Sequence, residues 1–279
     1  MNISKKSLGV MQGRLSPIVN NKIQCFPFKH WTREFKKLRS LNINKMEWTI
    51  EYPLFYKNPL MGTRGQKKIN ELKKKYKIEI NSITCDSLMQ KPFWKAKKYK
   101  TRINLINDFK NLINFSSLLK IKYIVVPLVD NGFIKNKVQK DNIIKTLKNL
   151  IPIINKKKVI ILFEFENNPK FISAFLKKLD PKIFGVNYDT GNSAAKKFSM
   201  DEEFNEYGRY IKNIHLKDKN EKSTSVPLGE GLVDFENFFY LLKKYNYKNN
   251  LIFQTARSKK GTHVNEIKKN IDFIKKFFV

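Results

Sequence analysis

The clearest signal of the fold is the stretch Ile183-Phe184-Gly185-Val186-Asn187-Tyr188-Asp189-Thr190-Gly191-Asn192. It begins as a buried strand rich in β-forming residues, and Asp180-Pro181 ends the helix before it. It ends at Asp189, after which Gly191 and Asn192 predict a turn. An unpaired carboxylate at the end of an apolar strand is costly to bury. Asp189 therefore needs a partner, which could be a helix or turn that it caps, a basic side chain or a metal ion.

The same layout recurs along the chain. Three further apolar strands end in polar side chains: Glu164 after 159–163, His215 in 211–216 and Gln254 in 251–254. Strand and helix patterns alternate throughout, which is typical of parallel βαβ units. No G-x-G-x-x-G follows the first strand, which argues against a Rossmann sheet. The α/β pattern predicts a single-domain (β/α)8 TIM barrel over residues 1–279.

The hydrophobic periods set the expected elements. The expected strands are 7–11, 45–50, 78–84, 123–127, 159–163, 183–189, 211–216 and 251–254. The expected helices are 31–41, 66–76, 97–119, 142–154, 169–179, 201–210, 235–245 and 264–278. Segments 52–65 and 219–233 are expected to be loops.

The composition is strongly basic, with 56 Lys and Arg against 24 Asp and Glu and a net charge of +32. Such a charge is typical of proteins that bind nucleic acid or acidic membranes. However, Lys greatly exceeds Arg, and lysines fall on solvated helix faces, as at 73–75 and 275–276. Plentiful Lys, Asn, Ile, Phe and Tyr also fit an AT-rich genome. We interpret the charge as a surface feature, with steering of an anionic ligand left open.

Location and partners follow from what the sequence lacks. No apolar run is long enough for a membrane helix or a signal peptide. Cys25 and Cys85 have no metal-type spacing and suit a reducing compartment. We therefore expect a cytoplasmic protein without a membrane partner. Apolar positions on the outer helices fit either core or subunit contacts, so a homo-oligomer stays open.

Four polar residues are expected to meet at one face of the barrel. In such barrels the carboxyl ends of the strands converge, and the chemistry takes place there. Glu164, Asp189, His215 and Gln254 would then lie side by side on successive strands. Oxygen ligands with one imidazole suit a divalent ion such as Mn²⁺, Co²⁺, Mg²⁺ or Zn²⁺. A lone histidine at a strand end is usually structural, but the four residues together predict a site for one divalent metal ion.

Three charged residues are candidates for substrate contacts. Arg14 follows the first strand, where it could hold a carboxylate or phosphate or form a buried ion pair that fixes the loop. Glu47 lies inside the apolar run 45–50, so it either points into the barrel mouth or is paired. Arg257 follows the last strand and is a second candidate for an anionic group.

Three motifs carry a resemblance to a known family. They are Val186-Asn187-Tyr188-Asp189-Thr190-Gly191-Asn192, Ile214-His215-Leu216-Lys217-Asp218 and Val226-Pro227-Leu228-Gly229-Glu230-Gly231 with Asp234-Phe235. With these motifs the chain resembles the xylose isomerase-like TIM barrels, in particular the sugar phosphate isomerase/epimerase group. The resemblance runs from 9–15 to 254–257 and implies that Glu164, Asp189 and His215 bind one divalent metal ion.

Two positions depart from the family pattern. Gln254 stands where sugar epimerases carry a metal-binding Glu that is also an acid/base group. An amide can offer an oxygen to a metal, but it cannot transfer a proton in this pH range. Asn192 stands where several relatives carry His. The two-carboxylate epimerase mechanism therefore does not carry over intact, which leaves one-base isomerisation or dehydration as alternatives.

The expected function is a metal-dependent isomerase or epimerase, with a dehydratase (lyase) as a variant, acting through an enediolate. The substrate would be a sugar or a sugar bearing phosphate or another anionic group. Glu164 would remove the proton, and Lys217, Glu230 or Glu47 would return it or protonate a leaving hydroxyl. Glu166, on the same strand face, would replace Glu164 if the register differs. The residues expected to bind substrate are Arg14, Glu47, Asn192 and Arg257.

Two other classes of function stay open. Because Gln254 replaces an acid/base group, the barrel could bind a carbohydrate derivative without turning it over. Endonuclease IV shares the barrel and would suit a basic chain, but it needs a trinuclear zinc cluster with many histidines. The chain has three histidines, His30, His215 and His263. This argues against a nuclease and against a nucleic-acid partner.

Overall fold

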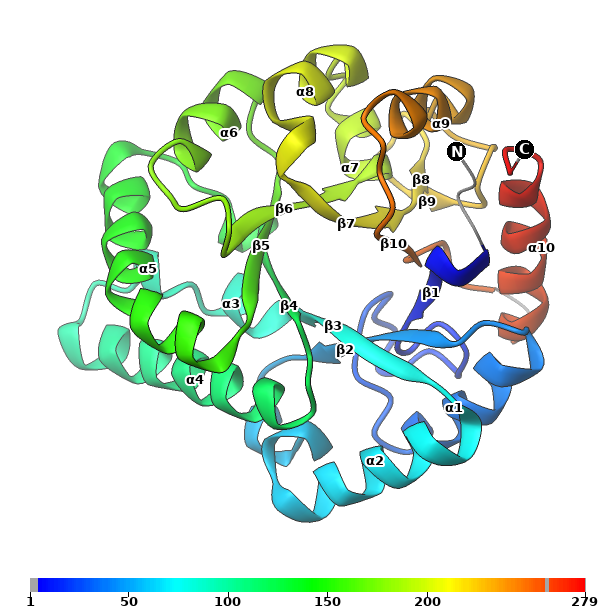
Figure 1. The fold of residues 1–279 in the computed structure, drawn as a ribbon, viewed down its shortest axis with the longest axis horizontal. Helices are drawn as coiled ribbons and strands as arrows, with labels where there is room; N and C mark the ends of the chain where they lie inside the picture. The colour runs from blue at the N-terminus through cyan, green and yellow to red at the C-terminus, as the bar shows by residue number, and fades with distance from the viewer. Residues whose placement is uncertain (1–4, 259–260, 279) are drawn as a thin grey trace.

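The computed structural model describes residues 5–258 and 261–278. Eight parallel strands close into a barrel in the order β1-β10-β7-β6-β5-β4-β3-β2. The connecting helices form a ring around it (Figure 1). The predicted single-domain (β/α)8 TIM barrel is confirmed, and with it the convergence of the strand ends on one face.

The elements have these bounds. The barrel strands are β1 Leu8–Met11, β2 Lys45–Ile50, β3 Glu79–Cys85, β4 Tyr123–Leu128, β5 Ile160–Phe165, β6 Phe184–Asp189, β7 Ile211–Leu216 and β10 Asn250–Phe253. The α-helices are α1 Trp31–Ser40, α2 Thr63–Tyr76, α3 Asp86–Gln90, α4 Tyr99–Leu118, α5 Lys137–Lys157, α6 Pro169–Leu176, α7 Thr190–Ala195, α8 Met200–Tyr207, α9 Phe235–Lys244 and α10 His263–Lys275. A hairpin pairs β8 Asp218–Lys219 with β9 Ser225–Val226.

Four segments differ from the sequence-based prediction. Helix α5 starts before 142 because Asn136 caps it, accepting a hydrogen bond from Gln139 N at 3.0 Å. The segment after Asp189, predicted to be a turn, is the short helix α7. Helix α3 and the β8–β9 hairpin were not expected, because neither has enough apolar residues to show a period.

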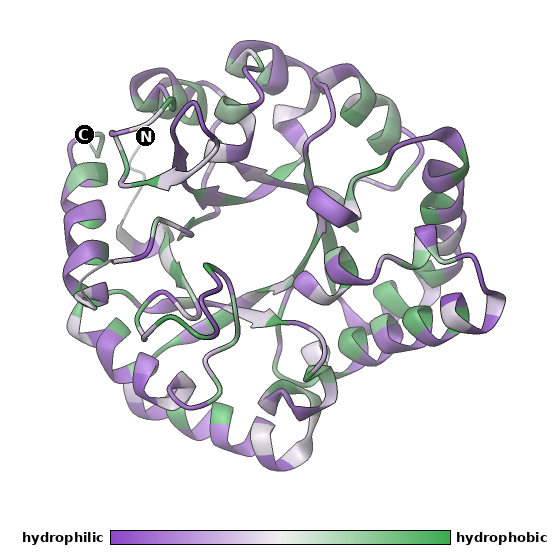
Figure 2. Ribbon diagram, turned by 180° about the vertical axis from the view of Figure 1, so that it is seen from behind, coloured by the Kyte–Doolittle hydropathy of each residue, from purple (hydrophilic) through white to green (hydrophobic). Residues whose placement is uncertain are grey.

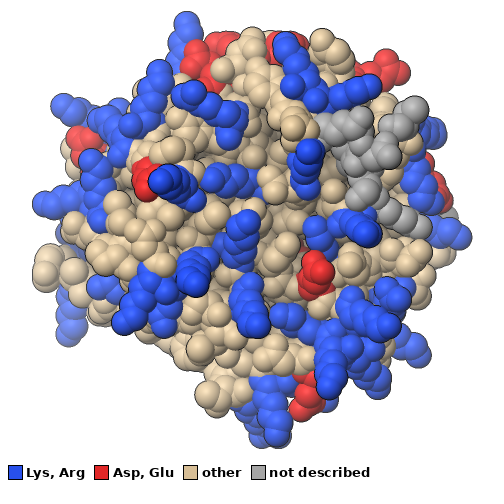
Figure 3. All heavy atoms as spheres, in the orientation of Figure 1, with Lys and Arg blue, Asp and Glu red and all other residues tan. Residues whose placement is uncertain are grey.

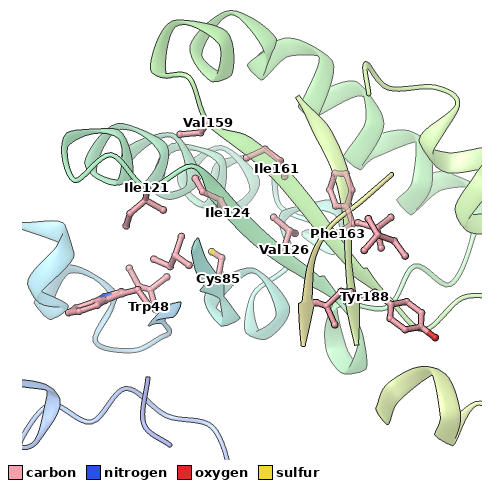
Figure 4. Close-up of a cluster of buried hydrophobic side chains, with 14 of the residues drawn as sticks. Trp48, Cys85, Ile121, Ile124, Val126, Val159, Ile161, Phe163 and Tyr188 are labelled. Carbon is pink, nitrogen blue, oxygen red and sulfur yellow. The ribbon is translucent and has the colours of Figure 1, made fainter. Parts of the chain in front are cut away.

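Alternation along the strands separates two apolar layers. On β5, Ile161 and Phe163 point outward into the main core beneath the helices, whereas Leu162 belongs to a separate cluster with Tyr123 and Val125. Figure 4 shows the outer layer, with Phe163 and its neighbours packed between strands and helices. Full burial of one such side chain contributes roughly 2–3 kcal/mol. The same alternation turns Glu164 to the inside of the barrel.

The surface is basic and the helices are amphipathic. Figure 2 shows hydrophilic and hydrophobic residues mixed along each outer helix. On the face drawn in Figure 3, Lys and Arg side chains are spread over the surface rather than gathered in one stripe. Within the described residues, no helix combines the length and apolar character needed to cross a membrane.

Candidate functional site

Three predicted metal ligands meet at the carboxyl ends of β5, β6 and β7. Glu164, Asp189 and His215 each offer one ligand atom, and these atoms all lie within 4.8 Å of one another. All three residues are buried. Asp189 and His215 are register partners on adjacent strands, so the sheet itself places them together. We call Glu164, Asp189 and His215 the triad.

The Glu164 carboxylate is held by amide donors. Asn187 Nδ2 donates to Oε2 at 2.9 Å, and Asn192 Nδ2 donates to Oε1 at 2.9 Å. His215 Nδ1 lies 3.0 Å from Oε2. Asn187 escaped the sequence analysis, although its place two residues before Asp189 put it on the same strand face. Hydrogen bonds to both oxygens therefore fix the orientation of the Glu164 carboxylate.

The ring of His215 spans two carboxylates. Its Nε2 lies 2.6 Å from Glu47 Oε1, on the opposite side from Glu164. Burial alone lowers the pKa of His215, but Glu47 and Glu164 outweigh burial and raise this pKa to about 10. For Glu47, burial raises the pKa, and the charge and hydrogen bond of His215 reverse the effect and lower it.

Glu47 is fully buried and does not line the cavity described below, which corrects its expected role as a substrate contact. Thr84 Oγ1 donates to its Oε1 at 2.7 Å, and Asn213 Nδ2 donates to its Oε2 at 2.9 Å. An acidic residue within an apolar run signals the barrel interior, but it does not give the depth at which the side chain sits. Glu47 therefore orients His215 from beneath.

Asp189 combines two of the roles that the sequence left open. Its Oδ1 accepts a hydrogen bond from Asn192 N at 2.8 Å, so it caps α7. Its Oδ2 lies 2.7 Å from Lys217 Nζ. Burial raises the pKa of Asp189, but Lys217 and His215 outweigh burial and lower it. Lys217 therefore forms its ion pair with Asp189 and not with the adjacent Asp218.

Gln254 has an unused oxygen. It follows β10, two residues after Ile252, the register partner of His215. Its Oε1 is buried and has no hydrogen-bond partner among the described residues. A buried amide oxygen without a donor is costly. The donor set of two carboxylates, one imidazole and this free amide oxygen therefore fits a divalent ion.

A cavity of about 580 Å³ is lined by Glu164 of the triad and is within the size range of small-ligand sites. Its polar lining includes Glu164, Asn192, Lys217 and Gln254, all singled out by the sequence. Arg14, Lys22 and Lys219 add positive charge. The two lysines were missed, because nothing in the sequence distinguishes them from many surface lysines.

The two arginines expected to hold an anion have different positions. Arg14 is buried and lines the cavity, and its Nη1 donates to Ile23 O at 2.8 Å. Burial and the nearby Arg257 lower the pKa of Arg14 to about 9. Arg257 donates to the carbonyls of Gly13 and Ser16 and is not among the lining residues. Its expected substrate contact is therefore replaced by a structural one that holds the loop after β1.

The structure also gives the positions of two further carboxylates for which the sequence suggested acid/base roles, Glu230 and Glu166. Glu230 is exposed and does not line the cavity, so the geometry does not support its expected acid/base role. Its segment is anchored instead by Asp218, which accepts backbone hydrogen bonds from Gly229 at 3.0 Å and Gly231 at 2.9 Å. Glu166 lines the cavity but pairs with Lys196 at 3.3 Å, whereas Glu164 belongs to the triad.

Comparison with known proteins identifies the family. The chain belongs to the xylose isomerase-like TIM barrel family, whose model matches residues 35–277. Among curated proteins, it is 35% identical over 91 residues to a putative L-ribulose-5-phosphate 3-epimerase, SgbU, from Haemophilus influenzae. That match spans 30% of this chain and 32% of the relative.

Solved structures show the same fold at low identity. D-allulose 3-epimerase from Methylomonas sp., in complex with D-allulose, is 13% identical with a TM-score of 0.77, covering 100% of this chain and 99% of that one. The IOLI protein with a bound zinc atom is 15% identical with a TM-score of 0.76, covering 98% and 99%. At these identities the likeness concerns the fold.

Proposed function

We propose that this protein is a metal-dependent sugar isomerase or epimerase. The observation that carries the proposal is the triad beside a polar cavity, with the unpaired Gln254 oxygen next to it. Relatives of this fold support it, because their names include 3-epimerases of D-allulose and L-ribulose 5-phosphate. A dehydration of a related sugar, a lyase reaction, would start from the same proton removal.

Glu164, Asp189, His215 and Gln254 would hold one divalent ion, Mn²⁺, Co²⁺, Mg²⁺ or Zn²⁺. The solved IOLI structure holds zinc in the same fold, which supports this part of the proposal. When bound, the ion would act as a Lewis acid and make the proton beside the sugar carbonyl more acidic. Nδ1 of His215 faces Glu164, because Glu47 takes the other ring nitrogen.

The chain's own residues would carry the proton chemistry. Glu164 is the base, since its carboxylate is fixed by amide donors and faces the cavity. Lys217 would polarise a substrate oxygen while it stays paired with Asp189. Asn192 would donate to a substrate hydroxyl. Burying the proton acceptor in a partly dry cavity strengthens each of these interactions.

Positive charge on one wall suits a phosphate or another anionic group. Arg14 is buried and lacks a carboxylate partner within salt-bridge distance among the described residues. Buried charges are normally paired, so an anionic ligand would complete this site. Lys22 and Lys219 lie on the same cavity lining. The substrate is therefore a small carbohydrate, with a phosphate as the favoured anionic group.

One alternative is favoured by a specific observation. Gln254 cannot transfer a proton, so a barrel that binds a carbohydrate derivative without turnover remains the second candidate. A cytoplasmic location is part of the main proposal, supported by two free cysteines, Cys25 and Cys85. The oligomeric state stays a prediction.

The test is proton exchange in deuterated water. The Mn²⁺-loaded protein would be incubated with D-fructose, D-allulose, D-tagatose and L-ribulose 5-phosphate, and deuterium at carbon would be followed by NMR. We expect exchange with at least one sugar, and a loss of about 10²–10⁴-fold in Glu164→Gln. Glu166→Gln distinguishes the two carboxylates and should keep exchange. Binding without exchange by the wild type would support the second candidate.

A further inference from the structure

The proposed reaction lacks a second proton carrier. An epimerase removes a proton from one face of a carbon and returns one to the other face, which takes two acid/base groups. Glu164 supplies one, but Gln254 cannot supply the other. The Lys217 ammonium is committed to Asp189 at 2.7 Å. A second acid/base group would therefore have to come from another residue that lines the cavity.

Asp86 is a cavity-lining carboxyl that the sequence analysis passed over. It follows β3 directly as the first residue of α3, and only 7% of its surface is exposed. It lines the same cavity as Glu164. Strand β3 is two positions from β5 in the barrel order, so Asp86 and Glu164 approach the cavity from different walls.

Asp86 is also unusual among the buried acids. Its side chain makes no hydrogen bond or ion pair with any described residue. Every other buried carboxyl in the described ranges accepts at least one hydrogen bond: Glu34, Glu47, Glu51, Glu164, Asp189, Glu203 and Asp218. A place in the first turn of a helix is ordinary for Asp, but here the side chain caps no backbone N–H. Among the described residues, no hydrogen bond or ion pair therefore offsets its burial, and only the more distant charges of His215 and Arg14 do so in part.

The two carboxyls have different surroundings. Amide donors hold both oxygens of Glu164, whereas Asp86 has no donor among the described residues. Burial, followed by the nearby Glu51 and Glu164, raises the pKa of Asp86 to about 8, against smaller opposing contributions from His215 and Arg14. A carboxyl that holds its proton near neutral pH can serve as the acid in a reaction in which another carboxyl is the base.

Building on the proposed function, we infer that Asp86 is the second catalytic acid/base residue, replacing the glutamate that is absent at position 254. Glu164 takes the proton from the carbon beside the carbonyl, and the C–H electron pair forms the C=C bond of the enediolate. The Asp86 O–H bond then breaks and its proton adds to that carbon from the opposite face. Its bonding electrons stay on Asp86, and the carbonyl re-forms. Proton exchange with water resets both carboxyls, so no oxidant or reductant is needed.

The test separates proton removal from inversion. Asp86→Asn keeps the shape of the protonated acid but carries no transferable proton. Wild type and variant would be loaded with Mn²⁺ and given each of the four sugars in deuterated water. We expect Asp86→Asn to keep deuterium exchange into the starting sugar and to lose about 10²–10⁴-fold in formation of the epimer. Glu164→Gln should lose both.

The controls make each outcome decisive. Asp234→Asn replaces an exposed carboxyl at the start of α9, which does not line the cavity, and should keep both activities. Asp86→Ser, which also suits a helix start, serves as the second variant if Asp86→Asn melts at a lower temperature. Unchanged epimer formation in either folded variant would overturn the inference, as would a parallel loss of exchange and inversion. Absence of exchange by the wild type would instead contradict the proposed function, and the role of Asp86 with it.

Discussion

His215 Nε2 lies 2.6 Å from Glu47 Oε1, so the ring whose Nδ1 faces Glu164 is fixed on its other side by a carboxylate from β2. This contact decides which ring nitrogen is available to a metal. The partners of Glu47, Thr84 and Asn213, fix its own carboxylate in turn. The site is thus built in layers, with its orienting groups deep in the barrel.

Replacing Glu47 should weaken metal binding without removing a ligand. In Glu47→Gln the ring loses its charged partner, and outer partners of metal ligands typically contribute about 10–100-fold in affinity. Mn²⁺ titration followed by calorimetry measures this. Glu203→Gln, another buried acid that accepts a hydrogen bond from Tyr188 at 2.8 Å, is the matched control and should bind Mn²⁺ as the wild type does. Equal affinities in Glu47→Gln and wild type would contradict the orienting role.

Adding a carboxylate at position 254 should tighten metal binding. The Gln254 Oε1 atom is buried and unpartnered, and Gln254→Glu would place a charged ligand there. We expect at least about tenfold higher Mn²⁺ affinity, equivalent to about 1.4 kcal/mol. Gln12→Glu, at the end of β1, controls for a general gain of negative charge. Unchanged or weaker binding in Gln254→Glu would place this side chain outside the metal site.

Two cavity lysines should discriminate between phosphorylated and neutral sugars. Each charge-assisted hydrogen bond contributes roughly 1.5–3 kcal/mol. A double variant that carries Lys22→Met and Lys219→Met should therefore raise KM for L-ribulose 5-phosphate by at least about tenfold. KM for D-fructose should stay within about twofold. Steady-state kinetics with both substrates measures the ratio, and an equal change for both would show that no phosphate binds at this wall.

Burial of Asp86 should make stability depend on pH. Its pKa is raised from 3.8 to about 8 in the folded chain by burial and then by Glu51 and Glu164, with His215 and Arg14 opposing. Between pH 3.8 and about pH 8, Asp86 is protonated in the folded chain but ionised in the unfolded chain. The contribution of Asp86 is therefore fully present below about pH 4, and it declines toward pH 8 by up to about 1.4 kcal/mol per pH unit.

Asp86→Asn removes this titration. In metal-free buffer with EDTA, its melting temperature relative to wild type should rise steadily from pH 5 to pH 8. Thermal unfolding at four pH values measures the difference. Parallel pH profiles for the two proteins would mean that Asp86 is already ionised in the folded chain at pH 5.

The fold was predictable because strand and helix patterns alternate along the chain, and several apolar strands end in polar residues. Glu164, Asp189 and His215 were found for the same reason, since parallel strands must bring such ends together. The depth of Glu47 and the loop contacts of Arg257 were not predictable. Whether a charged side chain near a strand end faces the cavity depends on loop paths, which sequence periodicity does not encode.

The position of Asp86 could not be predicted from the sequence either. In Thr84-Cys85-Asp86-Ser87, Asp86 follows a strand, as many turn residues do. The sequence does not reveal that its carboxyl group is buried without a hydrogen-bond donor. Asn187 was missed for the opposite reason, because an amide inside a strand suggests a structural hydrogen bond. Both residues take their roles from partners distant in sequence, such as Glu164.

We propose that the triad holds a divalent ion, and the metal content of the protein after Mn²⁺ loading and dialysis measures this binding. Asp189→Asn keeps a side chain that can cap α7 but removes the charge. Asp234→Asn is the matched control, because Asp234 caps α9 in the same way, accepting from Asn237 N at 2.9 Å. We predict about one ion per chain in wild type and Asp234→Asn, and much less in Asp189→Asn. Wild type without metal, or Asp189→Asn with a full complement, would contradict the account.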